Sequence, residues 1–273
     1  MNYQHIFHAG NHADVLKHAV LLELLAALSA KPSPWFVLDT HAGAGSHELA
    51  GNLEADSGIA RLWGQHHPAL ERYLTAVRGH NGDGKLRRYP GSPLLIAGAL
   101  RDDDRLACCE IQPDPAAALK ALFRNETRVG VHQRDGYAAI KALLPPAEKR
   151  GVVLIDPPYE TQQQEFDTIL ATLRDGLTRW PQGIFALWYP IKRRRTLLPF
   201  FRRVAALPIK SALLTELLVR PDDSPLRLNG SGMLLLNPPW RLDHALAPIL
   251  GALRDGLTEP GGSIRLEWLK PPA

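Results

Sequence analysis

The segment Asp156–Tyr159, with the sequence Asp-Pro-Pro-Tyr, combines groups that could hold the exocyclic amino group of a base. The nitrogen of such a group is a poor nucleophile because its lone pair is delocalised into the ring. A carboxylate at Asp156 and a proline carbonyl could accept its two N–H bonds and free that lone pair. The prolines stiffen the loop, and the ring of Tyr159 offers a face on which an extruded base can stack. We therefore predict Asp156 as the catalytic residue and Tyr159 as a substrate contact.

Three further signals lie where other apolar runs end, and they are typical of a nucleoside cofactor. Asp39 begins the turn Asp39–Gly45, whose glycines let a ligand approach the backbone closely. Glu110 ends the next run, where an acidic side chain can hold a ribose diol by two charge-assisted hydrogen bonds. Asp135-Gly136 follows the third and could accept from the amino group of the cofactor's adenine. Each alone fits an ordinary turn, but their recurrence at successive strand ends predicts a cofactor pocket.

The segment Asn237–Trp240, with the sequence Asn-Pro-Pro-Trp, fits the same general pattern as Asp156–Tyr159. Ligands gather at the carboxyl ends of the strands of a parallel sheet. The strand before Asn237 is expected to be antiparallel, so its carboxyl end points to the opposite edge. We therefore predict a structural role for Asn237–Trp240.

The N-terminal segment is dense in polar side chains: Tyr3, His5, His8, Asn11, His12, Asp14, Lys17 and His18. His8 and His12 have the i, i+4 spacing of a helical metal pair, but no further Cys/His cluster supplies a ligand set, so we expect no metal. Tyr3, His5 and Lys17 supply a stacking ring, an imidazole and a cation. These groups can grip an unstacked nucleotide and its phosphate, so we predict that the three contact the substrate.

The elements that must position these residues alternate short β-rich runs with helical stretches. Seven strands are expected: Trp35–Asp39, Leu106–Glu110, Arg128–His132, Gly151–Asp156, Gly183–Tyr189, Ser211–Val219 and Gly232–Asn237. Between the first five strands lie segments with helical periodicity, such as Pro115–Phe123 and Phe166–Arg179. This alternation predicts a parallel, doubly wound sheet. The last two follow each other without a helix and predict an antiparallel hairpin. Five parallel strands and a closing hairpin give an α/β, Rossmann-like fold, the strand arrangement of class I methyltransferases.

The connection between Asp39 and Leu106 is far longer than one crossover helix needs. It contains the turn-rich segment His80–Gly84, and such long connections usually carry function. We therefore predict a single domain over residues 1–273 with a small helical subdomain inserted at roughly residues 48–91, beside the active-site edge.

Composition sets the broad class of protein. The 273 residues are 45% hydrophobic with a net charge of +4, which suits one large domain and is compatible with a polyanionic partner. Basic residues cluster in three runs, 85–88, 192–195 and 202–203, each of which could equally be a solvated surface. Cys108 and Cys109 are the two cysteines, and neighbours in a strand are poorly placed to bridge. With no signal or membrane-spanning pattern, we predict a cytoplasmic monomer with no membrane contact.

Together these motifs resemble the bacterial ribosomal RNA large subunit methyltransferase J family, the 23S rRNA (adenine-2030-N6)-methyltransferases. The resemblance runs from Tyr3 to Trp240 and shows no departure at the motif positions. It is carried by the segments Phe7–His18, Asp39–Gly45, Tyr89–Pro93, Asp156–Tyr159 and Ala186–Pro190.

The resemblance implies a class I core that uses S-adenosylmethionine, a helical insertion after the first strand, and 23S ribosomal RNA as the partner. It also implies roles for individual residues. Asp156 would be the proton acceptor, Tyr3 would contact the RNA, and His5 and Lys17 would lie close to the same site. The residues that would contact S-adenosylmethionine are His18, His41, Ser92, Glu110, Asp135 and Gly136.

Other targets stay open on the residues alone. Asp156–Tyr159 also suits a DNA adenine or cytosine-N4 methyltransferase and a protein glutamine methyltransferase, and only the N-terminal motif favours ribosomal RNA. A non-catalytic RNA-binding protein on the same scaffold is the alternative from another class. Retention of Asp156 and of the acidic strand ends argues against it.

Overall fold

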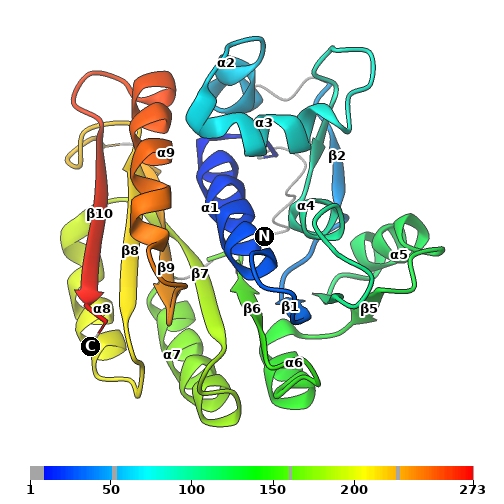
Figure 1. The fold of residues 1–273 in the computed structure, drawn as a ribbon. Coiled ribbons are helices and arrows are strands. Elements are labelled where there is room, and N and C mark those ends of the chain that lie inside the picture. The colour runs from blue at the N-terminus through cyan, green and yellow to red at the C-terminus, as the bar shows by residue number, and fades with distance from the viewer. Residues whose placement is uncertain (1–8, 51–53, 160–161, 226–227, 273) are drawn as a thin grey trace.

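The computed structural model describes residues 9–50, 54–159, 162–225 and 228–272, and its centre is an eight-stranded sheet. The strands lie in the order β10-β8-β9-β7-β6-β1-β4-β5 (Figure 1). Their bounds are β1 Trp35–Asp39, β4 Arg105–Glu110, β5 Val129–Gln133, β6 Arg150–Ile155, β7 Ile184–Ile191, β8 Ala212–Leu218, β9 Gly230–Leu236 and β10 Ser263–Lys270. Strands β1, β4, β5, β6 and β7 pair in parallel, and β9 is antiparallel to both β7 and β8.

The seven predicted strands and the class I arrangement are confirmed, but the strand count is wrong by one. The eighth strand, β10, pairs antiparallel with β8 at the edge of the sheet. Its residues are mostly half-buried, and Arg265, Glu267 and Lys270 give it a charged character that hides a strand in the sequence. Charged residues are typical of edge strands because they discourage further pairing.

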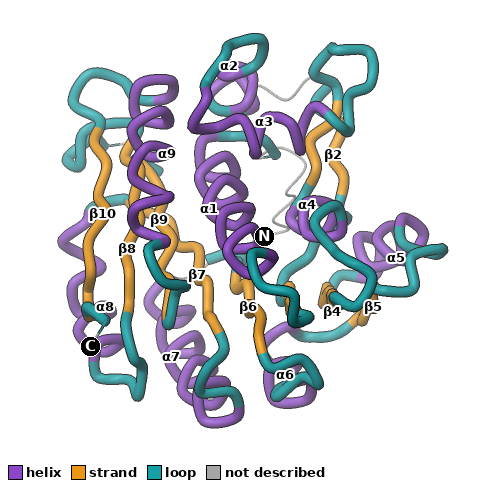
Figure 2. The backbone as a smooth tube through the Cα atoms, in the orientation of Figure 1, coloured by secondary structure: helices purple, strands orange, loops and turns teal. Residues whose placement is uncertain are grey.

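Helices cover both faces of the sheet (Figures 1 and 2). One hydrophobic cluster joins the sheet to α1 (His12–Ser29), α4 (Ser92–Ala97), α5 (Pro113–Leu122) and α9 (Leu242–Leu257). A second cluster joins the other face to α6 (Gly136–Leu143), α7 (Gln162–Arg179) and α8 (Leu198–Ala205). Among the helices that the structure describes, none is long and apolar enough to cross a membrane.

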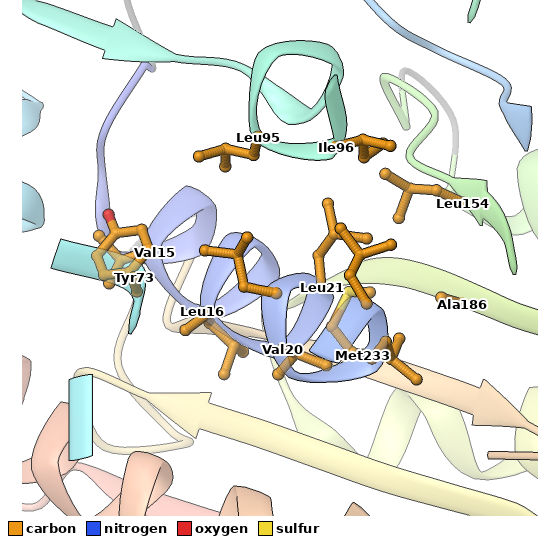
Figure 3. Close-up of a cluster of buried hydrophobic side chains, with 14 of the residues drawn as sticks. Val15, Leu16, Val20, Leu21, Tyr73, Leu95, Ile96, Leu154, Ala186 and Met233 are labelled. Carbon is orange, nitrogen blue, oxygen red and sulfur yellow. The ribbon is translucent and has the colours of Figure 1, made fainter. Parts of the chain in front are cut away.

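The first helix, α1, is buried along nearly its whole length. Asn11 caps it by accepting hydrogen bonds from the N–H groups of Ala13 and Asp14. Figure 3 shows its apolar side chains between α4 and strands β6, β7 and β9. Fully burying a Leu or Val side chain contributes roughly 1.5–3 kcal/mol, so α1 is a major part of the core.

The connection between β1 and β4 forms a compact unit that contacts the start of α1. Its elements are β2 (Ser46–Glu48), η2 (Ala55–Ser57), α2 (Ile59–Leu62), η3 (Pro68–Leu70), α3 (Glu71–Arg78) and β3 (Arg88–Pro90). Strands β2 and β3 pair antiparallel as a separate small sheet. The N–H of Ile59 donates to the carbonyl of Gly10, and Asn11 donates to Glu54 at 2.9 Å. The unit is thereby tied to the helix that enters the active-site region.

Candidate active site

The glycine turn after β1 and the acidic end of β4 meet at the carboxyl edge of the sheet. The N–H of Gly43 donates to Oε2 of Glu110 at 2.9 Å, and the N–H of Gln112 donates to its Oε1 at 2.7 Å. Gly43 and Gly45 have φ values of +61° and +80°, the left-handed region that favours glycine. A side chain at Gly43 would meet no atom within 4 Å, so the turn borders open space.

Asp39, at the end of β1, is fully buried beneath this turn. Its Oδ2 accepts a hydrogen bond from the hydroxyl of Ser92 at 2.6 Å, whereas its Oδ1 has no hydrogen-bond partner among the described residues. Burial, with repulsion from Asp156, raises the pKa of Asp39 to about 7 despite the hydrogen bond from Ser92. Ser92 therefore lies at the predicted cofactor pocket, with its hydroxyl engaged by Asp39.

Asp135 and Gly136 begin α6 beside the same turn. Oδ1 of Asp135 caps the helix by accepting the N–H of Ala138 at 2.7 Å. A Cβ atom on Gly136 would stand 2.0 Å from the carbonyl oxygen of Thr40, so only glycine allows this contact. Asp135 and Gly136 are thus fixed against the residues that follow β1.

His41 lies between these elements and is neutral at physiological pH. Burial lowers its pKa to about 4 even though Asp156 and Asp135 act in the opposite direction. Its Nδ1 lies 2.8 Å from the hydroxyl of Thr40, and its ring packs edge-on against Tyr137 at 5.2 Å. The hydroxyl of Tyr137 in turn donates to Glu165 of α7.

Asp156 follows β6 and is held by a buried lysine from α1. Nζ of Lys17 lies 2.5 Å from Oδ2 of Asp156 and 2.8 Å from Oδ1 of Asp14. Burial alone would lower the pKa of Lys17, but the two carboxylates outweigh it and raise that pKa above its ordinary value. Lys17 is therefore a permanent ammonium that fixes the predicted catalytic carboxylate, which is 15% exposed.

The position of Lys17 differs from what a phosphate contact requires. Its side chain is 4% exposed, and both carboxylates occupy its ammonium. This geometry suits a residue that positions Asp156, and contact of Lys17 with RNA stays a prediction. Asp14, which completes the arrangement, was not predicted as a site residue, although its i, i+3 spacing from Lys17 was a usable signal.

Tyr159 closes the Asp-Pro-Pro-Tyr segment in a left-handed conformation, with φ of 50°. Its hydroxyl donates to the carbonyl of Trp188 on β7 at 2.8 Å. Its ring packs edge-on against Trp188 and Phe166, each with ring centroids 5.7 Å away. The ring is therefore fixed next to Asp156. Trp188 belongs to the resemblance segment Ala186–Pro190, but neither it nor Phe166 was predicted as a site residue.

His18, one residue after Lys17, points into the core near the β3–α4 connection. Its Nδ1 lies 2.8 Å from the hydroxyl of Tyr89, which lies 3.0 Å from that of Tyr73. The His18 side chain is 1% exposed. Tyr3 and His5 lie outside the described residues.

The second Pro-Pro-aromatic segment lies at the opposite edge, as predicted. Asn237 follows the antiparallel strand β9, and its Oδ1 accepts the N–H of Lys210 at 2.9 Å. Its Nδ2 lies 3.2 Å from the carbonyl oxygens of Pro181 and Gly183, which precede β7. These backbone contacts agree with the predicted structural role of Asn237.

No group of three or more His, Cys, Asp or Glu side chains suited to a metal ion occurs in the part of the chain that the structure describes. His12 is buried, and its pKa is lowered to about 4 by burial and by Arg220. His8, its partner in the i, i+4 pair, lies outside the described residues.

Comparisons with known proteins agree with this geometry. A family model described as "Ribosomal RNA large subunit methyltransferase D, RlmJ" matches residues 32–270. The chain is 39% identical to "Ribosomal RNA large subunit methyltransferase J" of Escherichia coli and 40% identical to the protein of that name from Haemophilus influenzae, with 99% of each chain covered in both comparisons. The crystal structure of protein LPL1258 from Legionella pneumophila is 32% identical, covers 95% of this chain and 98% of its own, and superposes with a TM-score of 0.87. The chain therefore belongs to the ribosomal RNA large subunit methyltransferase J family.

Proposed function

We propose that this chain is an S-adenosylmethionine-dependent methyltransferase that methylates N6 of an adenine in 23S ribosomal RNA, adenine 2030 by family resemblance. One observation carries the proposal. The Asp156 carboxylate, fixed by Lys17, lies at the same sheet edge as the glycine turn and Glu110. The names of the two curated relatives support ribosomal RNA as the target class.

The residues around Asp39 fit the methionine part of this cofactor. A buried acceptor without a partner costs about 1–3 kcal/mol, and Oδ1 of Asp39 is such an atom among the described residues. The ammonium of the cofactor's amino-acid portion would satisfy it and would favour the ionised carboxylate. The open space beside Gly43 leaves room for the ligand. His18, His41 and Ser92 are proposed as further contacts of this part.

The nucleoside part of the cofactor fits the ends of β4 and β5. Each Glu110 oxygen accepts one backbone N–H, and a carboxylate has about four acceptor sites, so capacity remains for two ribose hydroxyls. Ile111, which is 56% exposed, would cover the adenine ring. Asp135 and Gly136 would meet the adenine edge.

When bound, S-adenosylmethionine supplies a methyl group activated by its sulfonium. Asp156 and the carbonyl of Pro157 would each accept one N–H of the adenine N6 amino group and thereby aim its lone pair. The proton that N6 gives up on methylation would pass to the Asp156 carboxylate. Lys17 keeps that carboxylate in place, which is the kind of preorganisation that accelerates transfer.

The target base would lie against Tyr159, whose ring is fixed on Trp188 and Phe166. Tyr3, His5 and Lys17 are proposed to contact the RNA at the same site. We propose a cytoplasmic monomer with one domain and an insertion at roughly residues 48–91. The cytoplasmic assignment is supported by Cys108 and Cys109, which are free and buried.

A transfer assay with labelled S-adenosylmethionine tests the proposal. RNA, DNA and protein substrates are offered separately, and the product is hydrolysed and identified by mass spectrometry. We expect N6-methyladenosine from unmodified 23S rRNA and no product from DNA or protein. Methylated DNA, methylated glutamine, or no transfer to any substrate would each overturn the proposal.

A further inference from the structure

The four consecutive basic residues Lys192–Arg195 follow β7 at the carboxyl edge of the sheet. Their backbone is fixed on both sides. The carbonyl of Lys192 accepts a hydrogen bond from Nδ2 of Asn229 at 2.8 Å, and the N–H of Arg194 donates to Oδ1 of Asp222 at 2.7 Å. The run is therefore a defined surface rather than a loose loop.

Arg194 differs from its three neighbours because it is an anchor. Its Nε donates to Oε2 of Glu216 at 2.6 Å, and its Nη1 donates to the hydroxyl of Ser263 at 3.0 Å. Glu216 is fully buried, so its charge needs this guanidinium. Arg194 thus belongs to the fold, whereas Arg193 is half-buried and Arg195 is exposed.

Lys192, Arg193 and Arg195 have no carboxylate partner among the described ion pairs, and Lys192 and Arg195 are exposed. The other two basic runs differ. Arg87 pairs with Asp83, Arg88 with Glu48, and Arg203 with Asp167. Of the three runs, 192–195 is the one that presents several uncompensated cations together.

This run follows β7, the strand to which Tyr159 of the predicted base site is bound. Tyr159 is bound to the carbonyl of Trp188, and the carbonyl of Pro190 accepts a hydrogen bond from Gln162. Lys192 lies four residues beyond Trp188, which is about 13 Å along an extended strand. This spacing suits phosphates further along the same nucleic-acid strand.

We propose that Lys192, Arg193 and Arg195 form a phosphate-binding surface for the RNA strand that flanks the target adenosine. This inference rests on the proposed function for the identity of the polyanion. A rigid array of cations beside the catalytic edge would orient the strand and add affinity that depends on salt but not on sequence. An acidic protein surface is the competing partner for the same charges.

The test compares two triple charge reversals that change the net charge by the same amount. One is Lys192→Glu, Arg193→Glu and Arg195→Glu. The control is Arg179→Glu, Lys210→Glu and Arg241→Glu, which places the same change near the amino edge of the sheet. Binding to a 23S rRNA fragment that contains the target is measured across a salt series, with S-adenosylmethionine binding and melting temperature as controls for folding.

We expect the first variant to bind RNA at least tenfold more weakly at low salt. The slope of log affinity against log salt should fall by about 2, because each single-strand phosphate contact contributes about 0.7. The control and a charge-preserving variant, Lys192→Arg with Arg193→Lys and Arg195→Lys, should keep the wild-type slope. Cofactor affinity should be unchanged in all three.

An unchanged slope in the first variant, or an equal loss in the control, would overturn the phosphate surface. Unaltered RNA binding with lost binding to acidic proteins would assign the surface to the competing partner. If wild-type protein binds RNA but transfers no methyl group, the proposed function fails, whereas the salt slopes still decide this inference.

Discussion

The chain contains two segments of one chemical pattern, Asp156–Tyr159 and Asn237–Trp240, at opposite edges of the same sheet. The polar side chain of the first faces a buried ammonium, and its aromatic ring is fixed beside it. The polar side chain of the second is bound to three backbone groups, and Trp240 is 82% exposed. Strand direction separates them, since β6 is parallel to its neighbours and β9 is antiparallel.

This difference shows that the role of an Asp/Asn-Pro-Pro-aromatic segment depends on the residues around it. A carboxylate is useful for transfer when it keeps lone pairs for a substrate, as Asp156 does beside Lys17. The side chain of Asn237 instead forms hydrogen bonds with Lys210, which precedes β8, and with Gly183, which precedes β7. It thereby links the two segments. The first segment is built for a ligand and the second for the fold, and mutations should separate the two.

The largest effect is expected from Asp156→Asn, which keeps the shape and removes the charge. Methyl transfer should fall by about 10²–10⁴-fold because a positioned base is lost, while S-adenosylmethionine binding stays near wild type. Single-turnover transfer and calorimetry measure the two quantities. Adding Asn237→Asp to this variant should not restore activity, and restoration would show that the edge of the sheet does not matter.

The free energy of unfolding should depend on pH through Asp39, by a few kcal/mol at most. Because burial raises the pKa of Asp39 to about 7, the folded protein binds a proton more tightly than the unfolded chain between about pH 4 and 7. The free energy of unfolding of the cofactor-free protein should therefore fall as pH rises through this window. Asp39→Asn should flatten the profile in denaturant titrations, and Asn237→Ala should leave its shape unchanged.

Glu110→Ala should weaken S-adenosylmethionine binding by at least about 10-fold, since even one hydrogen bond to a charged group contributes about 1.5–3 kcal/mol. Calorimetry gives the dissociation constant. Glu126→Ala removes a half-buried carboxylate that pairs with Arg128 away from the glycine turn, and it should bind the cofactor normally. Equal affinities for wild type and Glu110→Ala would contradict the assigned ribose site.

Asn237→Ala should lower the free energy of unfolding by about 1–3 kcal/mol without slowing transfer at temperatures where the variant is folded. The loss has two parts, the three backbone contacts and the left-handed φ of 52°. Asn237→Gly relieves only the second and should be intermediate in stability. A transfer defect in folded Asn237→Ala would give this segment a catalytic role.

The smallest effect is expected from Trp240→Ala. The side chain is exposed and stacks on the guanidinium of Arg241 at 5.9 Å, so stability should change by less than about 0.5 kcal/mol. Tyr159→Ala, by contrast, should impair transfer. If both aromatic variants behave alike in the same assay, the comparison between the segments fails.

Most of the sheet could be predicted because buried parallel strands are short apolar runs. Strand β10 could not, since its charged edge residues Arg265 and Glu267 break that pattern. The acidic residues at the strand ends could be recognised because each comes directly after an apolar run. The same position places them at the edge of the sheet where ligands bind.

The packing around the catalytic carboxylate could not be predicted. Lys17 and Asp156 are 139 residues apart in sequence, and no local pattern announces their contact. Lys17 therefore resembled a solvent-facing cation in the sequence, although the fold buries it. Ser92 and Asp39 are also far apart in sequence, so their contact could not be predicted. Neither residue alone indicates that one carboxylate oxygen of Asp39 lacks a hydrogen-bond partner among the described residues.

The burial of α1 has a consequence for how the protein emerges from the ribosome. This helix is synthesised before β9 and α9, which are part of the surface that covers it. Before β9 and α9 are synthesised, the leucine and valine side chains of α1 are only partly covered. Exposed apolar surface of this kind makes nascent chains prone to aggregation. The active site, which needs Lys17 from the same helix, is thus assembled late in synthesis. We therefore expect chains that end before β9 to lack methyl transfer.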